Sequence, residues 1–264
     1  MEKIVLRPSS LATFVGCSRQ WYQVFIKGHR SIPNARAAMG TGVHAGIEQM
    51  WNEAIKTKKK DPNLSMMNDA AVESYDKEVK LSEGSMQYDT DLDDNTVRAN
   101  LVKGNKAFVE DVVPMTDIPK AVETRVTKEI NHKIVKSISG TIDYLGDNVI
   151  ADVKTSKRKI VPASHTLQQS MYRYLANESG ENIEYNLIQG VVFNKTKTVG
   201  TTDALDCNVP QAKYITNNLL DRLDLAITDK IDPDIIFPGN PKHYLCSDKY
   251  CSLRSTCPFV NGDK

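Results

Sequence analysis

The sequence predicts an α/β fold in which a mixed central sheet is flanked by helices. Two observations support this class. Up to residue 112 the apolar residues recur at helical spacing, whereas after Pro119 β-branched residues dominate and alternate in part with polar ones. The strand-like segments are then interleaved with two further helical segments, and this order favours a sheet with helices packed on it. A helical N-terminal region and a cysteine-rich C-terminal tail complete the expected architecture.

The N-terminal region is expected to form several helices. Ser9 or Ser10 can cap the first of them. The polar stretch TKKKDPNLS interrupts the helical pattern, and we expect the segment 57–112 to be a helical insertion within a single domain that spans residues 1–264. The expected helices cover residues 9–28, 35–56 and, in two or three pieces, 66–112.

The middle of the chain is expected to form a three-stranded antiparallel meander, with turns at Asn131–His132 and Gly146–Asp147. A helix, two more strands and a last helix follow it. The tail, residues 238–264, is irregular and too poor in apolar residues to fold without a crosslink. The expected strands are 121–130, 133–145, 148–155, 185–196 and 199–209, and the expected helices are 164–179 and 209–231.

The composition indicates a folded protein without identifying its partner. The chain has 264 residues, 40% of them hydrophobic, and its 34 Lys and Arg against 33 Asp and Glu give a net charge of +1. Such a balance neither favours nor excludes nucleic acid, because a basic groove can be offset by an acidic outer face. No apolar run is long enough to span a bilayer, and the N-terminus lacks the apolar core of a signal peptide. A cytoplasmic protein without a membrane partner is expected.

Two carboxylates and a lysine are expected to share one small site. Asp152 and Lys154 are two apart on a predicted strand, so their side chains project from the same face. The preceding turn brings Asp143 alongside them. Carboxylate oxygens suit Mg2+, which can activate water for phosphodiester hydrolysis, and Lys154 can orient that water. An isolated Asp-x-Lys is also common on a solvated strand face, but apolar neighbours place Asp152 closer to the core.

Two more residues are candidate metal ligands. His44 begins a His-x-x-x-Glu pair with Glu48 on a helix, so the two share a face. A lone helical histidine is often structural, but His44 can also be a ligand that admits Mn2+ as well as Mg2+. Glu123, on the first strand of the meander, either adds a carboxylate to the site or is a surface charge.

Further residues are candidates for binding a phosphate-rich strand. Gln168 and Tyr172 are four apart on the helix after the meander, where they can position a phosphate or base or simply form a half-buried face. The basic run from Lys157 to Lys159 is either a solvated loop or a contact to a phosphate backbone.

Four of the five cysteines lie at the two ends of the chain. Cys246, Cys251 and Cys257 are bunched in the tail, and Cys17 is the best candidate for a fourth ligand. In a reducing compartment such clusters indicate a metal or iron–sulfur site more readily than disulfides. Zinc, a four-iron cluster and free buried thiols all remain open, while Cys207 is interpreted as a structural thiol.

Taken in order, these motifs resemble the RecB-like branch of the PD-(D/E)XK nuclease superfamily. The resemblance is greatest to its iron–sulfur members, the AddB nuclease domain and the CRISPR-associated RecB-like exonucleases. The tail departs from them, because its first two cysteines have a C-x4-C spacing where the family usually has C-x2-C, and zinc therefore stays open. The matching segments are SSLATFVGCSRQWY, GTGVH, GTIDYL, IADVKTS and QQSMY, followed by the cysteine triplet.

The resemblance implies a restriction-endonuclease-like core and a stand-alone, metal-dependent DNA exonuclease that prefers single-stranded ends, of the kind encoded by bacteriophages or CRISPR systems. Partner proteins in recombination, replication or CRISPR pathways remain unspecified. Two alternatives stay open, a non-catalytic DNA-binding or adaptor protein of the same fold and a structure-specific endonuclease.

The resemblance also implies a role for each matched residue. Lys154 assists the attacking water, and Gln168 and Tyr172 position the strand. A basic lining is expected from Arg19 and from Lys157, Arg158 and Lys159. The implied ligands of Mg2+ or Mn2+ are His44, Asp143, Asp152 and the carbonyl of Val153, and those of a structural [4Fe–4S] cluster are Cys17, Cys246, Cys251 and Cys257.

Overall fold

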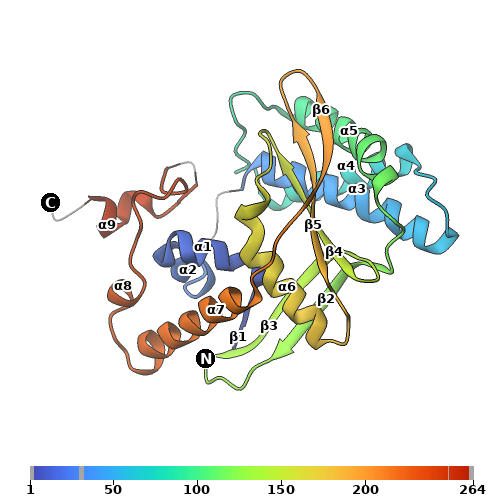
Figure 1. The fold of residues 1–264 in the computed structure, drawn as a ribbon. Helices are drawn as coiled ribbons and strands as arrows, with labels where there is room; N and C mark the ends of the chain where they lie inside the picture. Colours follow the sequence, from blue (N-terminus) through green and yellow to red (C-terminus); the bar gives the residue numbers. More distant parts are fainter. Residues whose placement is uncertain (1–2, 30–32, 249, 262–264) are drawn as a thin grey trace.

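The centre of the molecule is a mixed six-stranded sheet, which lies between two groups of helices (Figure 1). The structure, a computed structural model, describes residues 3–29, 33–248 and 250–261. The predicted α/β class with a mixed sheet is confirmed. The strands are β1 (Ile4–Leu6), β2 (Ala121–Glu129), β3 (Val135–Leu145), β4 (Val149–Ser156), β5 (Tyr185–Phe193) and β6 (Thr198–Ala204).

Strand β3 organises the sheet. Along one edge it pairs antiparallel with β2, from Ala121 opposite Leu145 to Glu129 opposite Ser137. Along its other edge it pairs in parallel with β1 near its start and antiparallel with β4 at its end. Strand β4 continues to β5 in parallel, and β5 to β6 antiparallel. The predicted meander is therefore confirmed, although β3 and β4 stay together only beside their turn.

The helices cover both faces of this sheet. Figure 1 shows α1, α2, α6 and α7 on one side and α3, α4 and α5 on the other. None of the described helices combines the length and the apolar character that a membrane-spanning helix needs. The helices are α1 (Leu11–Gly16), α2 (Ser18–Phe25), α3 (Ala35–Thr57), α4 (Leu64–Leu81), α5 (Asp94–Asp111), α6 (Thr166–Glu178), α7 (Val209–Leu223), α8 (Pro233–Ile236) and α9 (Pro258–Asn261).

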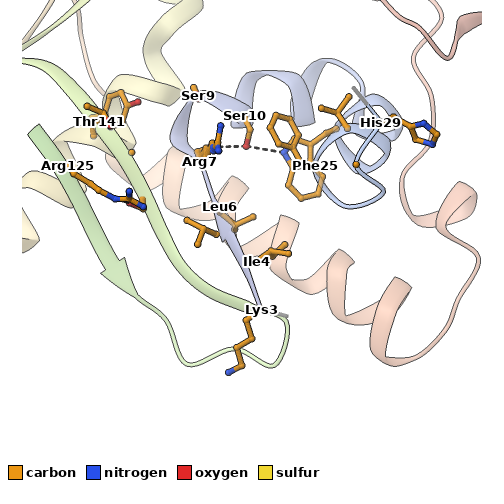
Figure 2. Close-up of a pocket in the computed structure, with 17 residues that line it drawn as sticks. Lys3, Ile4, Leu6, Arg7, Ser9, Ser10, Phe25, His29, Arg125 and Thr141 are labelled. Atoms are coloured by element: carbon orange, nitrogen blue, oxygen red, sulfur yellow. Dashed lines mark hydrogen bonds between the residues drawn. The ribbon is translucent and has the colours of Figure 1, made fainter. Parts of the chain in front are cut away.

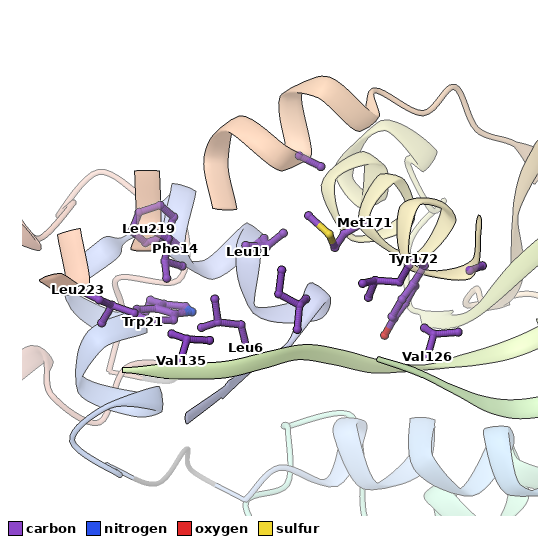
Figure 3. Close-up of a cluster of buried hydrophobic side chains, with 14 of the residues drawn as sticks. Leu6, Leu11, Phe14, Trp21, Val126, Val135, Met171, Tyr172, Leu219 and Leu223 are labelled. Atoms are coloured by element: carbon purple, nitrogen blue, oxygen red, sulfur yellow. The ribbon is translucent and has the colours of Figure 1, made fainter. Parts of the chain in front are cut away.

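The first core cluster joins the two ends of the chain (Figure 3). Trp21 is fully buried, and its ring lies 5.7 Å from that of Phe14 and 6.1 Å from that of Phe237. Leu219 and Leu223 of α7 complete the same cluster. Aromatic pairs of this kind add to the stability that the burial of apolar area alone provides. The packing of these side chains therefore holds the N-terminal helices to the C-terminal segment without a metal ion.

The second core cluster lies on the opposite face and contains the predicted insertion. Helices α4 and α5 pack with α3 against the sheet, where Trp51 contacts both Phe108 and Tyr144. The side chain of Asn34 caps α3 by accepting the N–H of Arg36 at 2.9 Å. Residues 66–112 form two helices, and both belong to the layer that covers the sheet.

Two expectations about the elements are wrong, and one strand was not foreseen. The helix expected over 9–28 is a short 3-10 turn followed by α1 and α2, which are separated at Cys17, where the backbone is extended (φ −154°). Strand β1 was not expected. The last helix ends its regular α turns at Leu223 and continues as a π-helical turn to Thr228. Residue 249 and residues 262–264 of the predicted tail lie outside the described residues.

Candidate active site

Asp143 lies where strands β3 and β4 separate. The two strands share two residue pairs beside their turn. Beyond these pairs, the Asp143 carboxylate takes the place of a main-chain carbonyl of β3. Its Oδ2 accepts the main-chain N–H of Val153 at 2.7 Å. The side chain therefore lies in an opening of the sheet that residues from both helical layers approach.

Asp152 and Lys154 project from the same face of β4, as the strand alternation predicts. Lys154 Nζ lies 2.5 Å from Asp152 Oδ2. Gln168 of α6 donates its Nε2–H to Asp152 Oδ1 at 2.8 Å. Asp152 is 3% exposed, so one cation and one amide hold a carboxylate that is almost entirely removed from water. The shared face of Asp152 and Lys154 agrees with the sequence, the bond from Gln168 to Asp152 was not predicted, and the catalytic roles of all three stay predictions.

His44, Glu123 and Asp143 bring three ligand atoms into one small space. His44 comes from α3, and its Nδ1 lies 3.5 Å from Asp143 Oδ2. Glu123 comes from β2 and lies directly opposite Asp143, because the residues on either side of it pair in register with β3. The ligand atoms of the three residues all lie within 4.8 Å of one another. Of the two alternatives left open for Glu123, the geometry favours a carboxylate that belongs to the site.

The backbone of Glu123 is unusual for a strand, since its φ is +46°. A non-glycine residue in this region costs on the order of 1–3 kcal/mol and persists where the surrounding structure requires it. Here the strained residue is the one that carries the third carboxylate. The strain is therefore consistent with a functional constraint on the position of this side chain.

The site holds more negative than positive charge. Withdrawal from water, followed by the charges of Asp143, Glu48 and Asp152, raises the pKa of Glu123 to about 7. Burial is also the main reason that the pKa values of Asp143 and Asp152 lie above the ordinary value, although Lys154 acts in the opposite direction. Carboxylates that resist ionisation in this way favour a cation, because a cation removes both the repulsion and the need for a proton.

His44 is neutral at pH 7. Burial, with the positive charge of Lys154 as the second cause, lowers its pKa to about 4. A neutral imidazole keeps a lone pair for a metal ion. His44 also makes a hydrogen bond with the main chain of Val153, the residue whose carbonyl the sequence predicts as an additional ligand.

These side chains open into a cleft of about 630 Å3 between α3 and the strands β2 to β4. Glu48, one turn along α3 from His44, reaches the same cleft, as their shared helix face predicts. The charged and titratable residues that line it are Arg36, His44, Glu48, Glu123, Asp143 and Lys154.

Tyr172 packs closely against Gly140 of β3. A Cβ built on Gly140 would be 2.5 Å from Tyr172 Cε1, so the close approach of the ring requires glycine here. Tyr172 is 6% exposed, and burial raises the pKa of its hydroxyl. The hydroxyl interacts with Gln168, which in turn holds Asp152. The pair therefore supports the acidic residues directly, and contact with a strand remains a prediction.

The expected basic residues are divided between different parts of the surface. Lys157 Nζ lies 2.6 Å from Asp91, at the rim beside Arg36. Arg158 is exposed in the same loop. Arg19 is not at the cleft, because its guanidinium pairs with Asp234 and lies over the ring of Phe259, and the residue lines a cavity shared with the terminal cysteines. Its predicted place in a basic lining is wrong.

The four terminal cysteines meet. All of them line one cavity of about 20 Å3, formed by the end of α1 and by the tail. Burial raises the pKa of the Cys251 thiol, and the other three thiols act on it in the same direction. The N–H of Asn240 points at Cys17 Sγ at 3.4 Å. The predicted convergence of Cys17 with the tail is therefore present, and what the thiols bind stays a proposal.

Cys207 does not line this cavity, and its thiol interacts with Ser170 and Arg173.

One residue near the site has no counterpart in the sequence prediction. Arg125 follows Glu123 by two positions on β2, so both side chains project from one face of the strand. The spacing alone contained this signal. The signal depends on the position of Glu123, which the structure places beside Asp143.

Comparison with known proteins identifies the superfamily. Its model, the PD-(D/E)XK nuclease superfamily, matches residues 6–258. Among solved structures, the chain is similar to a "Putative exonuclease" from Eubacterium rectale at 11% identity and a TM-score of 0.55, covering 86% of this chain and 83% of that one. It also matches SSO0001 at 12% identity over 94% of this chain and 96% of that one, with a TM-score of 0.36 that is too low for comparing folds. No curated protein matches. Because the superfamily model covers nearly the whole sequence, and the fold agrees with it, the chain belongs to the PD-(D/E)XK nuclease superfamily.

Proposed function

We propose that this protein is a metal-dependent DNA exonuclease of the RecB-like type, which hydrolyses phosphodiester bonds at single-stranded ends. The observation that carries the proposal is the convergence of His44, Glu123 and Asp143 within 4.8 Å, beside Asp152 and its partner Lys154. Membership of the nuclease superfamily supplies the class of reaction, and the name of the structural neighbour from Eubacterium rectale points the same way.

The donors suit Mg2+ or Mn2+. Carboxylate oxygens are the ligands that hard divalent ions prefer, and an imidazole admits Mn2+. Asp143, Asp152, His44 and the carbonyl of Val153 are the proposed ligands, and Glu123 adds a third carboxylate. Divalent ions in such a site lower the pKa of bound water and neutralise charge on phosphoryl oxygens.

The neighbouring side chains have separate roles in this proposal. Lys154 is the cation closest to Asp152, and it orients the attacking water or neutralises the charge that develops on the phosphate. Gln168 holds the other oxygen of Asp152 at 2.8 Å, which fixes the direction of the carboxylate, as the outer partners of ligands commonly do. Tyr172 interacts with Gln168 through its hydroxyl, and with Gln168 it is proposed to position the DNA strand.

The proposal includes a structural [4Fe–4S] cluster on Cys17, Cys246, Cys251 and Cys257. The four thiols line one small cavity, and four thiolates can hold either a tetrahedral zinc ion or a four-iron cluster. The resemblance to the iron–sulfur members of the superfamily favours the cluster, and zinc is the alternative.

Digestion of end-labelled DNA tests the proposed activity. Wild type should shorten linear single-stranded DNA with Mg2+ or Mn2+ and should leave it intact in EDTA. Asp152→Ala should lose this cleavage, whereas Asp147→Ala should keep it, because Asp147 is a turn residue whose side chain is 92% exposed.

Other outcomes would select the alternatives. Full metal-dependent cleavage by Asp152→Ala would show that the assignment of the site is wrong. Cleavage of circular single-stranded DNA would indicate an endonuclease. Wild-type protein that binds DNA without cutting it under any metal would indicate an adaptor.

A further inference from the structure

A second cavity, of about 1170 Å3, is lined by residues of the N-terminal segment, of α2 and of the strands β2 and β3 (Figure 2). Arg125 of β2 and Thr141 of β3 form one side of it, and Phe25 and His29 at the end of α2 form another. It is larger than a typical small-molecule pocket of roughly 300–1,000 Å3. Of the residues given a role above, Tyr172 is among those that line it.

The cavity and the cleft share one face of the β2–β3 ladder. Glu123 lies opposite Asp143, and two residues further along Arg125 pairs with Thr141. Side chains two apart on a strand project from the same face, about 7 Å from one another. This step is similar to the separation of successive phosphates in an extended nucleic-acid strand. A nucleic-acid strand whose scissile phosphate lies at Asp143 therefore has its next phosphate near Arg125.

The guanidinium of Arg125 is held in place but keeps free donors. Its Nε–H is donated to Ser139 Oγ at 3.2 Å, and Ser139 in turn shares a hydrogen bond of 2.6 Å with Thr127 Oγ1. Ser139 is 5% exposed, so this anchor is rigid. Throughout the described part of the chain, no carboxylate forms an ion pair with Arg125. An arginine fixed through Nε presents its terminal N–H groups to a phosphate.

The rest of the lining has the same character. Lys3 and Arg7 also lack an ion-pair partner among the described residues, and none of the described residues that line the cavity is an aspartate or glutamate. Phe25 is 39% exposed and Val5 42% exposed, so apolar surface lies next to the cations. Cations beside exposed aromatic surface are typical of sites for single strands, because an unpaired base can stack on the ring, whereas the base faces of a duplex are covered by their neighbours.

We infer that this cavity binds the single-stranded nucleotides next to the scissile phosphate. Arg125 contacts the adjacent phosphate, Arg7 and Lys3 contact the backbone beyond it, and Phe25 stacks on a base. The inference rests on the proposed nuclease function and deepens it, since it gives a physical origin for a preference for single strands. It concerns binding, so it can be tested apart from cleavage.

The test measures binding of a fluorescent single-stranded oligonucleotide by anisotropy in EDTA, over a series of salt concentrations. Arg125→Gln should weaken binding about tenfold and reduce the slope of log K against log[salt] by about 0.7, the value for one phosphate contact on a single strand. Arg125→Lys should recover most of the slope. The control is Lys136→Gln, an exposed cation on β3 outside the cavity, which should leave the slope unchanged.

Phe25→Ala provides an independent measurement. It should weaken binding of a normal oligonucleotide by about fivefold or more, and it should have no effect on an abasic strand of the same length. Wild-type affinity and slope in Arg125→Gln would overturn the inference, as would an equal loss for blunt duplex DNA. Binding that depends on Arg125 in a protein that cuts nothing would support the cavity while rejecting the nuclease proposal.

Discussion

Glu123 and Asp143 face each other across the ladder between β2 and β3, and with His44 they place three ligand atoms within 4.8 Å. Among the described residues that line the cleft, Lys154 lies next to these acids, and Arg36, at the edge, is the other lysine or arginine. The neighbouring charges and withdrawal from water raise the pKa of Glu123 to about 7. In the metal-free protein this arrangement opposes folding at neutral pH, and a bound divalent ion removes the opposition.

Glu123→Gln should therefore stabilise the metal-free protein in a way that depends on pH. Because the folded-state pKa of Glu123, about 7, lies above the ordinary value of 4.5, the folded state holds more protons than the unfolded state between these limits. Wild-type stability then falls as pH rises through this window. In thermal unfolding with EDTA, the Tm of the variant should exceed that of wild type at pH 8, and the two should converge near pH 4.

Divalent ions should reverse this order. Wild type should gain more from Mn2+ than Glu123→Gln does, since a ligand at about one hundred times its Kd stabilises the folded state by about 2.7 kcal/mol. Glu110→Gln, which alters an exposed carboxylate of α5, is the matched control and should show neither effect. A Tm difference that ignores both pH and Mn2+ would show that Glu123 is a surface charge.

His44→Gln should change the acid side of the stability profile. The folded-state pKa of His44, about 4, lies below the ordinary value of 6.5, so the unfolded state takes up the proton first. Wild type consequently loses stability as pH falls from 6.5 towards 4, by at most about 3 kcal/mol from this residue. Urea unfolding in EDTA should show a shallower decline for the variant over this range. Parallel profiles would mean that His44 is not buried in its neutral form.

The sequence predicted the parts of the site that belong to one element. Asp152 and Lys154 share a face because of the two-residue period of a strand, and His44 lies on a helix whose apolar spacing is regular. The convergence of Cys17 with the tail followed from the chemistry of thiols more than from any local pattern.

Features that depend on distant contacts were not predictable. Strand β1 has only three residues and exists because it pairs with β3 more than a hundred positions later. The separation of α1 from α2 at Cys17 falls within a segment whose apolar spacing is that of one continuous helix. The place of Arg125 opposite Thr141 follows from the register of β2 on β3, and the positive φ of Glu123 is a local departure from strand geometry. No local sequence pattern specifies either feature.

Gly140→Ala should destabilise the protein and weaken cleavage together. The added methyl would lie 2.5 Å from Tyr172 Cε1 and 3.1 Å from Pro8 Cδ, and overpacking of this kind costs about 1–3 kcal/mol. The ring must then move, and with it Gln168, which holds Asp152. Urea unfolding and initial cleavage rates measure the two effects.

A double-mutant cycle isolates this contact. Tyr172→Ala removes the ring and should relieve the cost of Gly140→Ala, whereas Tyr172→Phe keeps the ring and should not. Equal costs of Gly140→Ala in all three backgrounds would place the strain at Pro8 or in the backbone of β3.

Cys17→Ser should remove the proposed cluster and lower stability without altering the proposed chemistry of the cleft. Protein purified without oxygen should be brown and contain about four irons per chain, and Cys17→Ser should lose most of this iron and its visible absorption. Cys207→Ser is the matched control, because Cys207 does not line the cysteine cavity, and its iron content should be unchanged.

The fall in Tm of Cys17→Ser should be moderate, since Ser18 Oγ still donates to the Pro238 carbonyl at 2.9 Å and holds α2 to the tail. Cleavage per folded molecule should persist at low temperature. One zinc per colourless chain would reject the cluster, and loss of kcat in a fully folded variant would reject its structural role.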